Sequence, residues 1–324
     1  MLNSPSTRQL TSTFATTSFS MSPEALIDSA RKTIKSFDRW CHKTFEFPPE
    51  YHSLTSLRQV FADGFAVPQI LKVDPSLKEE ALPAYVSTMM AEKCDYPFYL
   101  VSPNILKALL KTTPPKYWDR DEVKLGFPCI HFVLPKGVLK GDDGEDVAVM
   151  SISIVSPGDL LNLGIGLQSH SKDDRLLCTA TSVTSQTNWY AFIPIENGVI
   201  DLEAKILTRK SKWDIGEDPA KVTVFTQDQL IPLLLQLAML FHLRPENVEE
   251  ASFIKRVKGK HGQREFWTPR FLGRRYAIQS EVTGTHASPE THWRIGHYRQ
   301  QHYGKGNVNI KTIWLDPVMV NAPR

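Results

Sequence analysis

Cysteine is scarce and dispersed in this chain. Its 324 residues include four cysteines, Cys41, Cys94, Cys129 and Cys178, and none of them forms a CxxC pair. Structural zinc sites and disulfide frameworks need closely spaced or paired cysteines. The sequence therefore predicts reduced, buried thiols in a cytoplasmic protein.

Long apolar runs and the familiar catalytic loops are also missing. The apolar stretch from Ile231 to Leu243 is too short to cross a bilayer, which needs about 20 helical residues. Gly164-Ile165-Gly166-Leu167 lacks the third glycine of a phosphate-binding loop, and the chain has no GxSxG nucleophile elbow. We therefore expect no membrane segment, no nucleotide cofactor and no serine-hydrolase site.

Charge is nearly absent from the first twenty residues. Ten of them are Ser or Thr, and Arg8 is the only charged side chain before Glu24. Such a segment cannot build a core, which predicts a disordered leader over residues 1–20. It lacks the arginines of a transit peptide and the apolar region of a secretion signal, so an unstructured tail, or translation from Met21, is the favoured interpretation.

The amino-terminal third has helical patterning. Ser22-Pro23-Glu24 has the residue types of a helix start, and apolar residues then recur at helical spacing up to Trp40. Two more helices are predicted near Leu54 to Asp63 and Leu77 to Cys94. A strand at Phe98 to Val101 and a helix from Pro103 to Lys111 follow.

Beyond Pro114-Pro115 the apolar period changes from helical to alternating. Strands at Ile130 to Leu134 and Val147 to Val155, with a Gly-Asp-Asp-Gly turn at 141–144 between them, predict an antiparallel pair. Met150, Ile152 and Ile154 alternate with serines, which predicts a half-buried strand. The remaining predicted elements are a strand at Trp189 to Ile195, an apolar helix at Gln227 to His242, irregular backbone after Lys255, and strands at Arg275 to Val282 and Lys311 to Val320.

These elements predict an α+β fold, in which an antiparallel sheet packs against helices. With 41% hydrophobic residues the chain can bury a substantial core. We expect three parts: the leader, an α+β body over residues 21–254, and a basic carboxy-terminal segment over residues 255–324. Strands on both flanks would hold the basic segment against the body.

The basic segment concentrates charge and histidine. Between Lys255 and Lys311 there are twelve Lys or Arg against three Glu, a local net charge of +9, whereas the whole chain carries +3. Five of the ten histidines lie between His261 and His302. Such asymmetry is typical of a polyanion-binding segment.

Nucleic-acid binding is one interpretation of this segment, because guanidinium groups contact phosphates and aromatic rings stack on unpaired bases. The candidate binding residues are Arg270, Arg274, Arg275, His286, His292, Trp293, Arg294, His297, Tyr298, Arg299, Tyr303 and Lys305. The alternative is structural: the aromatic rings pack in the core, the histidines bond the backbone, and the arginines are solvated or paired with acids elsewhere.

Two chemical alternatives use the histidines. His292, His297 and His302 recur every five residues, which neither a helix nor a strand brings to one face, and no acid lies between Thr291 and Leu315. A metal site is therefore disfavoured, and none is expected. A metal-independent ribonuclease could use His292 and His297 as general base and acid with Arg294 stabilising the phosphorane, although no nuclease signature is present.

The carboxy-terminal motifs resemble those of a known family. They are Trp267-Thr268-Pro269-Arg270-Phe271-Leu272-Gly273, Gly284-Thr285-His286-Ala287-Ser288-Pro289, His292-Trp293-Arg294, Gly296-His297, Arg299-Gln300, Tyr303-Gly304, Ile313-Trp314-Leu315-Asp316-Pro317 and Val320-Asn321. Together they are similar to the signature of type V-A anti-CRISPR proteins that block biogenesis of the CRISPR effector nuclease. Glu290-Thr291 and Ile295 depart from it, which makes the segment less basic than the family pattern.

The resemblance implies a cytoplasmic, non-enzymatic regulator encoded by a phage or plasmid. Family members are understood to recognise an amino-terminal peptide of the nascent effector and to cause loss of the message being translated. The implied partners are thus a nascent polypeptide and RNA or the ribosome, with no cofactor. The other hypotheses are a histidine-dependent ribonuclease, an RNA-binding protein and a structural protein of a mobile element.

Overall fold

The computed structural model describes residues 18–19, 35, 47–57, 60, 98–115, 117–119, 129–158, 165–166, 174–184, 187–196, 198–201, 207–212, 226–259, 262–281 and 292–320. Apart from helical Lys35, the predicted helix after Ser22 lies outside these residues, as does the one at Leu77 to Cys94. Residues 54–57 are helical where a helix was expected. Within the predicted leader, only β1 (Ser18–Phe19) is described, and it pairs with β7 (Ile165–Gly166).

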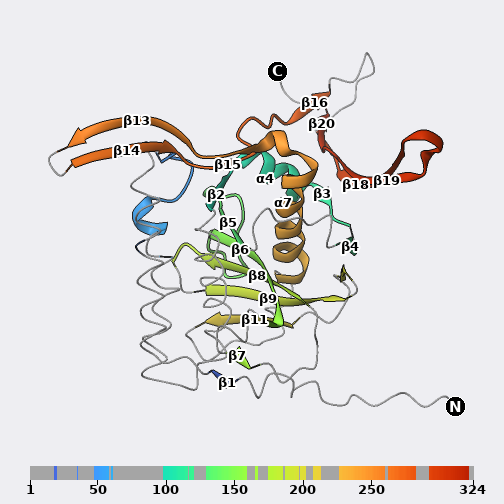
Figure 1. Ribbon diagram of the computed structural model, residues 1–324, viewed down its shortest axis with the longest axis horizontal. Helices are drawn as coiled ribbons and strands as arrows, with labels where there is room; N and C mark the ends of the chain where they lie inside the picture. The colour runs from blue at the N-terminus through green and yellow to red at the C-terminus, as the bar shows by residue number, and fades with distance from the viewer. Residues whose placement is uncertain are drawn as a thin grey trace.

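A ten-stranded sheet forms the centre of the molecule (Figure 1). In spatial order its strands are β12 (Val248–Glu249), β15 (Phe271–Leu272), β2 (Phe98–Val101), β5 (Cys129–Val133), β6 (Val147–Val155), β8 (Arg175–Ser182), β9 (Thr187–Glu196), β10 (Val199–Asp201) and β4 (Tyr117–Asp119), and β11 (Leu207–Lys212) also pairs with β9. β2 runs parallel to β15 and β5, and the other pairings are antiparallel. The predicted α+β class is confirmed, with a mixed sheet.

β2, β5, β6 and β9 confirm the strands expected there, but β6 is not half-buried as predicted. Ser151 and Ser153 are 1% and 0% exposed, as deeply buried as Met150 and Ile152. The Ser151 and Thr179 hydroxyls lie 2.6 Å apart across the β6–β8 pair. A small hydroxyl with such a cross-strand partner can be buried, and Ser153 is buried although its hydroxyl has no hydrogen-bond partner among the described residues. Alternation with serine therefore did not indicate a solvent face.

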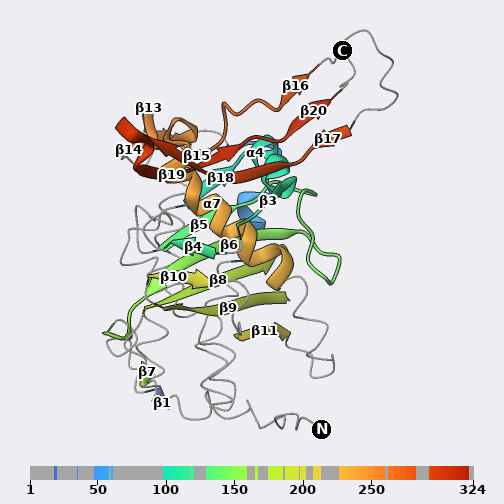
Figure 2. The same cartoon turned by 90° about the vertical axis from the view of Figure 1, so that its right-hand side faces the viewer.

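Two helices pack with this sheet. α4 (Pro103–Leu110) begins at Ser102, whose side chain accepts a hydrogen bond from the Asn104 amide. α7 (Ile231–Leu243) follows a π-helical turn, η3 (Thr226–Leu230), and is buried on every side from residue 231 to 240. It contacts β6 and α4 (Figure 2). Both helices confirm the predictions, and no helix within the described ranges is long and apolar enough to span a membrane.

Two β-hairpins extend from one end of this body in opposite directions (Figure 1). The first arm consists of β13 (Ser252–Gly259) and β14 (Gly262–Thr268). The second arm consists of β18 (Gly296–Tyr303) and β19 (Asn309–Leu315), joined by the turn η5 (Lys305–Asn307). β3 (Thr112–Thr113) adds to the second arm in parallel with β18.

The expected irregular backbone after Lys255 is wrong, because the first arm occupies that region. Every β13 residue is exposed, so no apolar period distinguishes a buried face. The strand expected at residues 275–282 is confirmed but shorter (279–281), whereas the one expected at 311–320 is interrupted at Asp316-Pro317 and falls on two strands of different sheets. β16 (Gln279–Glu281), β20 (Val318–Val320) and β17 (His292–Arg294) form a separate three-stranded sheet.

Candidate functional site

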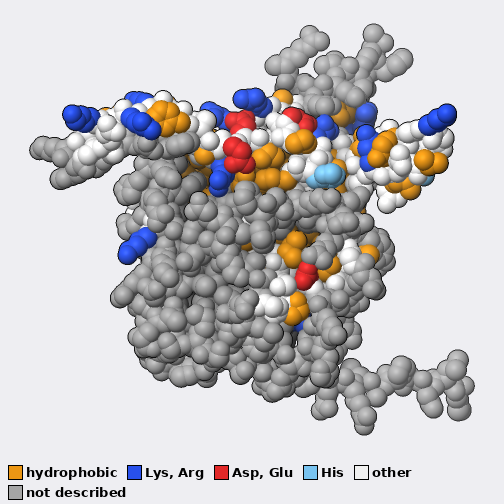
Figure 3. All heavy atoms as spheres, viewed as in Figure 1, with side chains coloured by type: hydrophobic (Ala, Val, Ile, Leu, Met, Phe, Trp, Pro, Cys, Tyr) orange, Lys and Arg blue, Asp and Glu red, His pale blue; other side chains and the backbone are white. Residues whose placement is uncertain are grey.

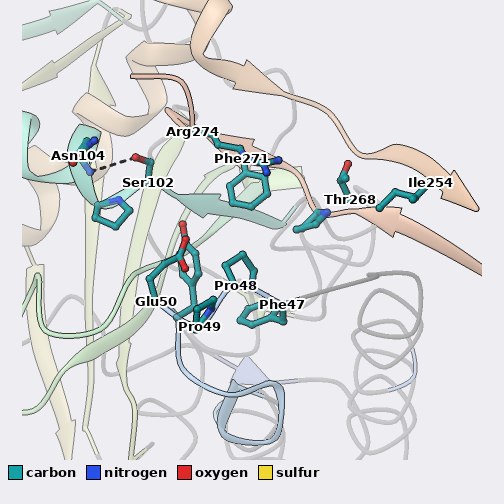
Figure 4. A pocket seen from close by; sticks show the side chains of 13 residues that line it. Phe47, Pro48, Pro49, Glu50, Ser102, Asn104, Ile254, Thr268, Phe271 and Arg274 are labelled. Atoms are coloured by element: carbon teal, nitrogen blue, oxygen red, sulfur yellow. Dashed lines mark hydrogen bonds between the residues drawn. The ribbon is translucent and has the colours of Figure 1, made fainter. Parts of the chain in front are cut away.

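A groove of about 590 Å³ lies where the first arm joins the body (Figure 4). Residues 47–50 form one side, and Phe271 and Arg274 face them from the other. Pro269 and the exposed Ile254 extend the second side along the arm. The walls are thus mainly apolar side chains of proline and aromatic residues.

The wall formed by residues 47–51 is held to the sheet by several hydrogen bonds. The Tyr51 hydroxyl donates to the Val101 carbonyl at 2.8 Å, and burial raises the pKa of this phenol. The Lys136 amide donates to the Glu50 carbonyl at 2.9 Å, and the Lys136 ammonium donates to the Pro49 carbonyl at 3.0 Å. This side of the groove is therefore preorganised.

Opposite charges stand on the two sides of the groove. Glu50 is exposed on one wall, while the exposed Arg274 guanidinium lies 4.8 Å from the centre of the Phe271 ring on the other. At its end, the groove is lined by Ser102 and Asn104 from the start of α4. Apolar walls with a few placed charges and amides are typical of sites for small molecules or peptide side chains.

Acidic residues in and after β12 bind the arginines at the root of the first arm. Arg270 Nε lies 2.9 Å from Glu250, and Arg275 Nε lies 3.3 Å from Glu249. The Tyr99 hydroxyl also donates to Glu250 at 2.5 Å, and burial together with this contact raises the pKa of Tyr99. The Arg270–Glu250 contact joins the residues that follow β14 and β12, whereas the Arg275 side chain is 81% exposed.

The root of the second arm is buried in an aromatic cluster. Trp314 is 3% exposed and donates from Nε1 to the Thr112 hydroxyl at 3.2 Å. The Tyr298 ring packs 5.8 Å from Trp118, and burial raises the pKa of its phenol. Arg244 donates to Asp316 at 2.6 Å, and the Tyr276 hydroxyl donates to the same carboxylate at 3.0 Å.

The predicted binding residues occupy three different places. Arg270, Arg274 and Arg275 lie around the first arm's root. His292, Trp293 and Arg294 form β17, whereas His297, Tyr298, Arg299, Tyr303 and Lys305 belong to the second arm. His286 lies outside the described residues. The space-filling view shows Lys and Arg toward both arm ends, with acids between (Figure 3).

The histidines of the second arm have different environments. His297 and His302 are five residues apart in β18, so they point to opposite faces. His302 Nδ1 lies 3.1 Å from the Asn307 carbonyl and helps to close the arm's turn. Within the part of the chain that the structure describes, no group of three or more His, Cys, Asp or Glu could hold a metal.

The groove was not predicted from the sequence. Its walls come from residues 47–51, 102–104, 254 and 268–274, which no single periodicity connects. The available signals were Pro48-Pro49 and Pro269, residues that stiffen a wall without supplying backbone donors. They do not indicate that distant segments converge.

The structure thus combines an α+β body, a preorganised groove and two protruding β-ribbons. Residues 99–322 match the AcrVA2-like model, the anti-CRISPR type V subtype A2 family. This match covers more than half of the chain, so the protein belongs to that family. The match begins within β2 and includes both arms and β3 to β20, but not residues 47–51. No curated protein matches the chain.

Proposed function

We propose that this anti-CRISPR protein recognises a peptide of a type V-A effector while the effector is being synthesised and thereby lowers the level of its message. Membership of the AcrVA2-like family is the observation that carries the proposal. The implied site of action is the cytoplasm, where the message is translated. The protein acts by binding, not by catalysis.

The groove at the root of the first arm is the proposed peptide site. Its apolar walls suit aliphatic or aromatic side chains, and Glu50 and Arg274 offer opposite charges to a peptide lying across it. A peptide provides side chains for such pockets, whereas a basic surface alone detects backbone charge with little sequence preference. Peptide recognition therefore explains how one message is selected.

A pair of reporters tests the coupling to translation. One reporter carries the effector's coding start, and the other carries nearly the same RNA with a frameshift that changes the peptide. We expect the first message to fall and the second to persist. Equal repression of both would show that RNA sequence is recognised, which contradicts the proposal.

Variants of the groove test the site. Arg274→Ala removes a charge that lines the groove, and we expect it to reduce repression and binding of the effector's amino-terminal peptide. Arg275→Ala is the matched control, because Arg275 is adjacent, 81% exposed and paired with Glu249 but does not line the groove. Equal effects of the two substitutions would remove the groove from the proposal.

A further inference from the structure

The register of the second arm sorts its side chains onto two faces. In an antiparallel pair, directly opposed residues share a face and successive residues alternate. One face has Tyr298 and Trp314 at its root, where both pack into the body, followed by Gln300, Thr312, His302 and Ile310. The outer face carries His297, Arg299, Gln301, Tyr303, Asn309 and Lys311, all exposed, above partly buried Ile313 and Leu315.

This outer face has cations and amides without a nearby acid. Residues 296–315 contain no Asp or Glu. Arg270 and Arg275 have carboxylate partners, whereas the described residues provide none for Arg299 or Lys311. Two unneutralised cations beside the Gln301 and Asn309 amides favour an anionic ligand with several oxygen acceptors.

Tyr303 adds an aromatic surface to the same face. Its side chain is 44% exposed, and the Lys311 ammonium lies 5.5 Å from the ring centre. The cation lies over one face of the ring, which leaves the opposite face for a stacked base. Stacking requires an unpaired base, because the faces of bases in a duplex are already covered by their neighbours.

Arg299 and Tyr303 are separated by four residues of an extended strand, about 13 Å. The body holds the arm's root rigidly through Trp314 and Thr112. The arm therefore presents a line of contacts along its length, which suits a flexible strand better than a compact anion.

We propose that the outer face of the second arm binds single-stranded RNA, with Arg299 and Lys311 contacting phosphates and Tyr303 stacking on a base. This inference goes beyond the proposed function, since it requires neither the peptide groove nor an effector. It assigns a contact surface to one of the two arms of the basic segment that project from the body.

Fluorescence anisotropy of the full-length protein with a labelled single-stranded RNA of about 12 nucleotides tests this proposal. We expect affinity to fall with salt by a logarithmic slope of about 0.7 for each phosphate contact. Replacing Arg299 and Lys311 together by Ala should reduce that slope by about 1.4. Tyr303→Ala should weaken binding about tenfold and leave the slope unchanged.

The hairpin offers a matched control on its opposite face. Gln301→Ala should weaken RNA binding, whereas Gln300→Ala, one residue away and on the other face, should not. Lys140→Ala, in the turn between β5 and β6, controls for general loss of positive charge. Chemical denaturation of each variant separates loss of binding from loss of fold.

Three results would overturn the proposal. These are absence of binding at low salt, equal losses from the Gln300 and Gln301 substitutions, and equal affinity for polyglutamate or for a blunt RNA duplex. The anisotropy measurement of RNA binding does not depend on the reporter assay for peptide-dependent repression. The RNA surface and the proposed regulatory function can therefore fail separately.

Discussion

Gly273 connects β15 to the groove wall in a conformation that few other residues can adopt. Its φ is +76°, and an added Cβ would lie 2.5 Å from Ile105 Cγ2 in α4. Its amide donates to the Asn247 carbonyl at 2.7 Å. The residue therefore fixes the path of the chain between Phe271 and Arg274, two of the side chains that line the groove.

Gly273→Ala should lower the free energy of unfolding by about 2 to 4 kcal/mol, because strain from positive φ adds to the clash with Ile105. Urea denaturation measures this loss. Gly144→Ala is the control, since Gly144 has a φ of +80° but nothing within 4 Å of the added carbon. It should cost about 1 kcal/mol; equal losses would mean that the contact with Ile105 is unimportant.

His131 gives the fold a dependence on pH. It is buried beside the Phe98 ring, at 5.1 Å between ring centres, and burial lowers its pKa from 6.5 to about 4. Between these values the unfolded chain binds a proton that the folded chain does not. The contribution of neutral, buried His131 to the free energy of unfolding is complete above the pKa of the unfolded chain. It decreases as pH falls, and about 2 kcal/mol of it is lost near pH 5.

Comparison with His131→Phe tests this contribution. Urea unfolding midpoints of both proteins should be measured near neutral pH and near pH 5. The substitution removes the titrating group, so the decrease between the two pH values should be smaller in the variant. An unchanged decrease would assign the effect to other groups.

At the scale of elements, the second arm depends on its root and not on its tip. Trp314 contacts Tyr276 in a stacked arrangement, 5.7 Å between ring centres, and bonds Thr112. Trp314→Ala should therefore lower the free energy of unfolding by about 3 to 5 kcal/mol. Val308, 77% exposed near the tip, should tolerate Ser within about 0.5 kcal/mol, measured by the same unfolding experiment.

A similar cost for the two substitutions would contradict this division of the arm. If it holds, the tip can vary in sequence without loss of the fold. Tyr303 and Lys311 can then be replaced in binding experiments without loss of the fold.

Some buried strands were predicted from the sequence, whereas the buried strand β8 and the exposed first arm were not. β2 at residues 98–101 and β6 at 147–155 were found with their observed bounds, because uninterrupted or alternating apolar residues indicate a strand. The first arm was missed because Phe253 and Val257 stand among exposed cations and β13 has no buried face. The pairing of β13 with β14 is therefore not visible in the local pattern of apolar residues.

At the scale of the whole molecule, stability should be unequal between the body and the arms. β6 and β8 lie in the interior of the sheet, whereas the first arm is a two-stranded ribbon with β13 fully exposed. Isolated two-stranded ribbons are marginal in water. Amides of β6 should therefore exchange with solvent near the rate of global unfolding, and those of β13 orders of magnitude faster.

Hydrogen exchange read by mass spectrometry measures this difference on peptides from the two regions. Equal protection of β6 and β13 would show that the first arm packs against another surface in solution. The same experiment with the effector's amino-terminal peptide present should protect residues 268–274 if the groove is its site.

The groove was less predictable than the fold because it is assembled from segments that are remote in the sequence.

The surface residues of the second arm were predictable in part. Composition showed that charge is concentrated after Lys255, and this placed Arg299, Tyr303 and Lys305 among the candidate binding residues. It did not separate Tyr298, which packs on Trp118, from Tyr303, which is exposed. That distinction depends on strand register, which residue types do not reveal.

The parallel pairing of β2 with β15 has a consequence for how the protein is made. Leu100 is opposed by Phe271, and Thr112 bonds Trp314 near the end of the chain. Contacts between such distant residues form late, since the intervening chain must first exist and then close. The groove therefore requires synthesis through Arg274, and the second arm requires synthesis through Leu315. A copy terminated before Arg274 would lack both, so a nonsense mutation just before that position should be as inactivating as an early one.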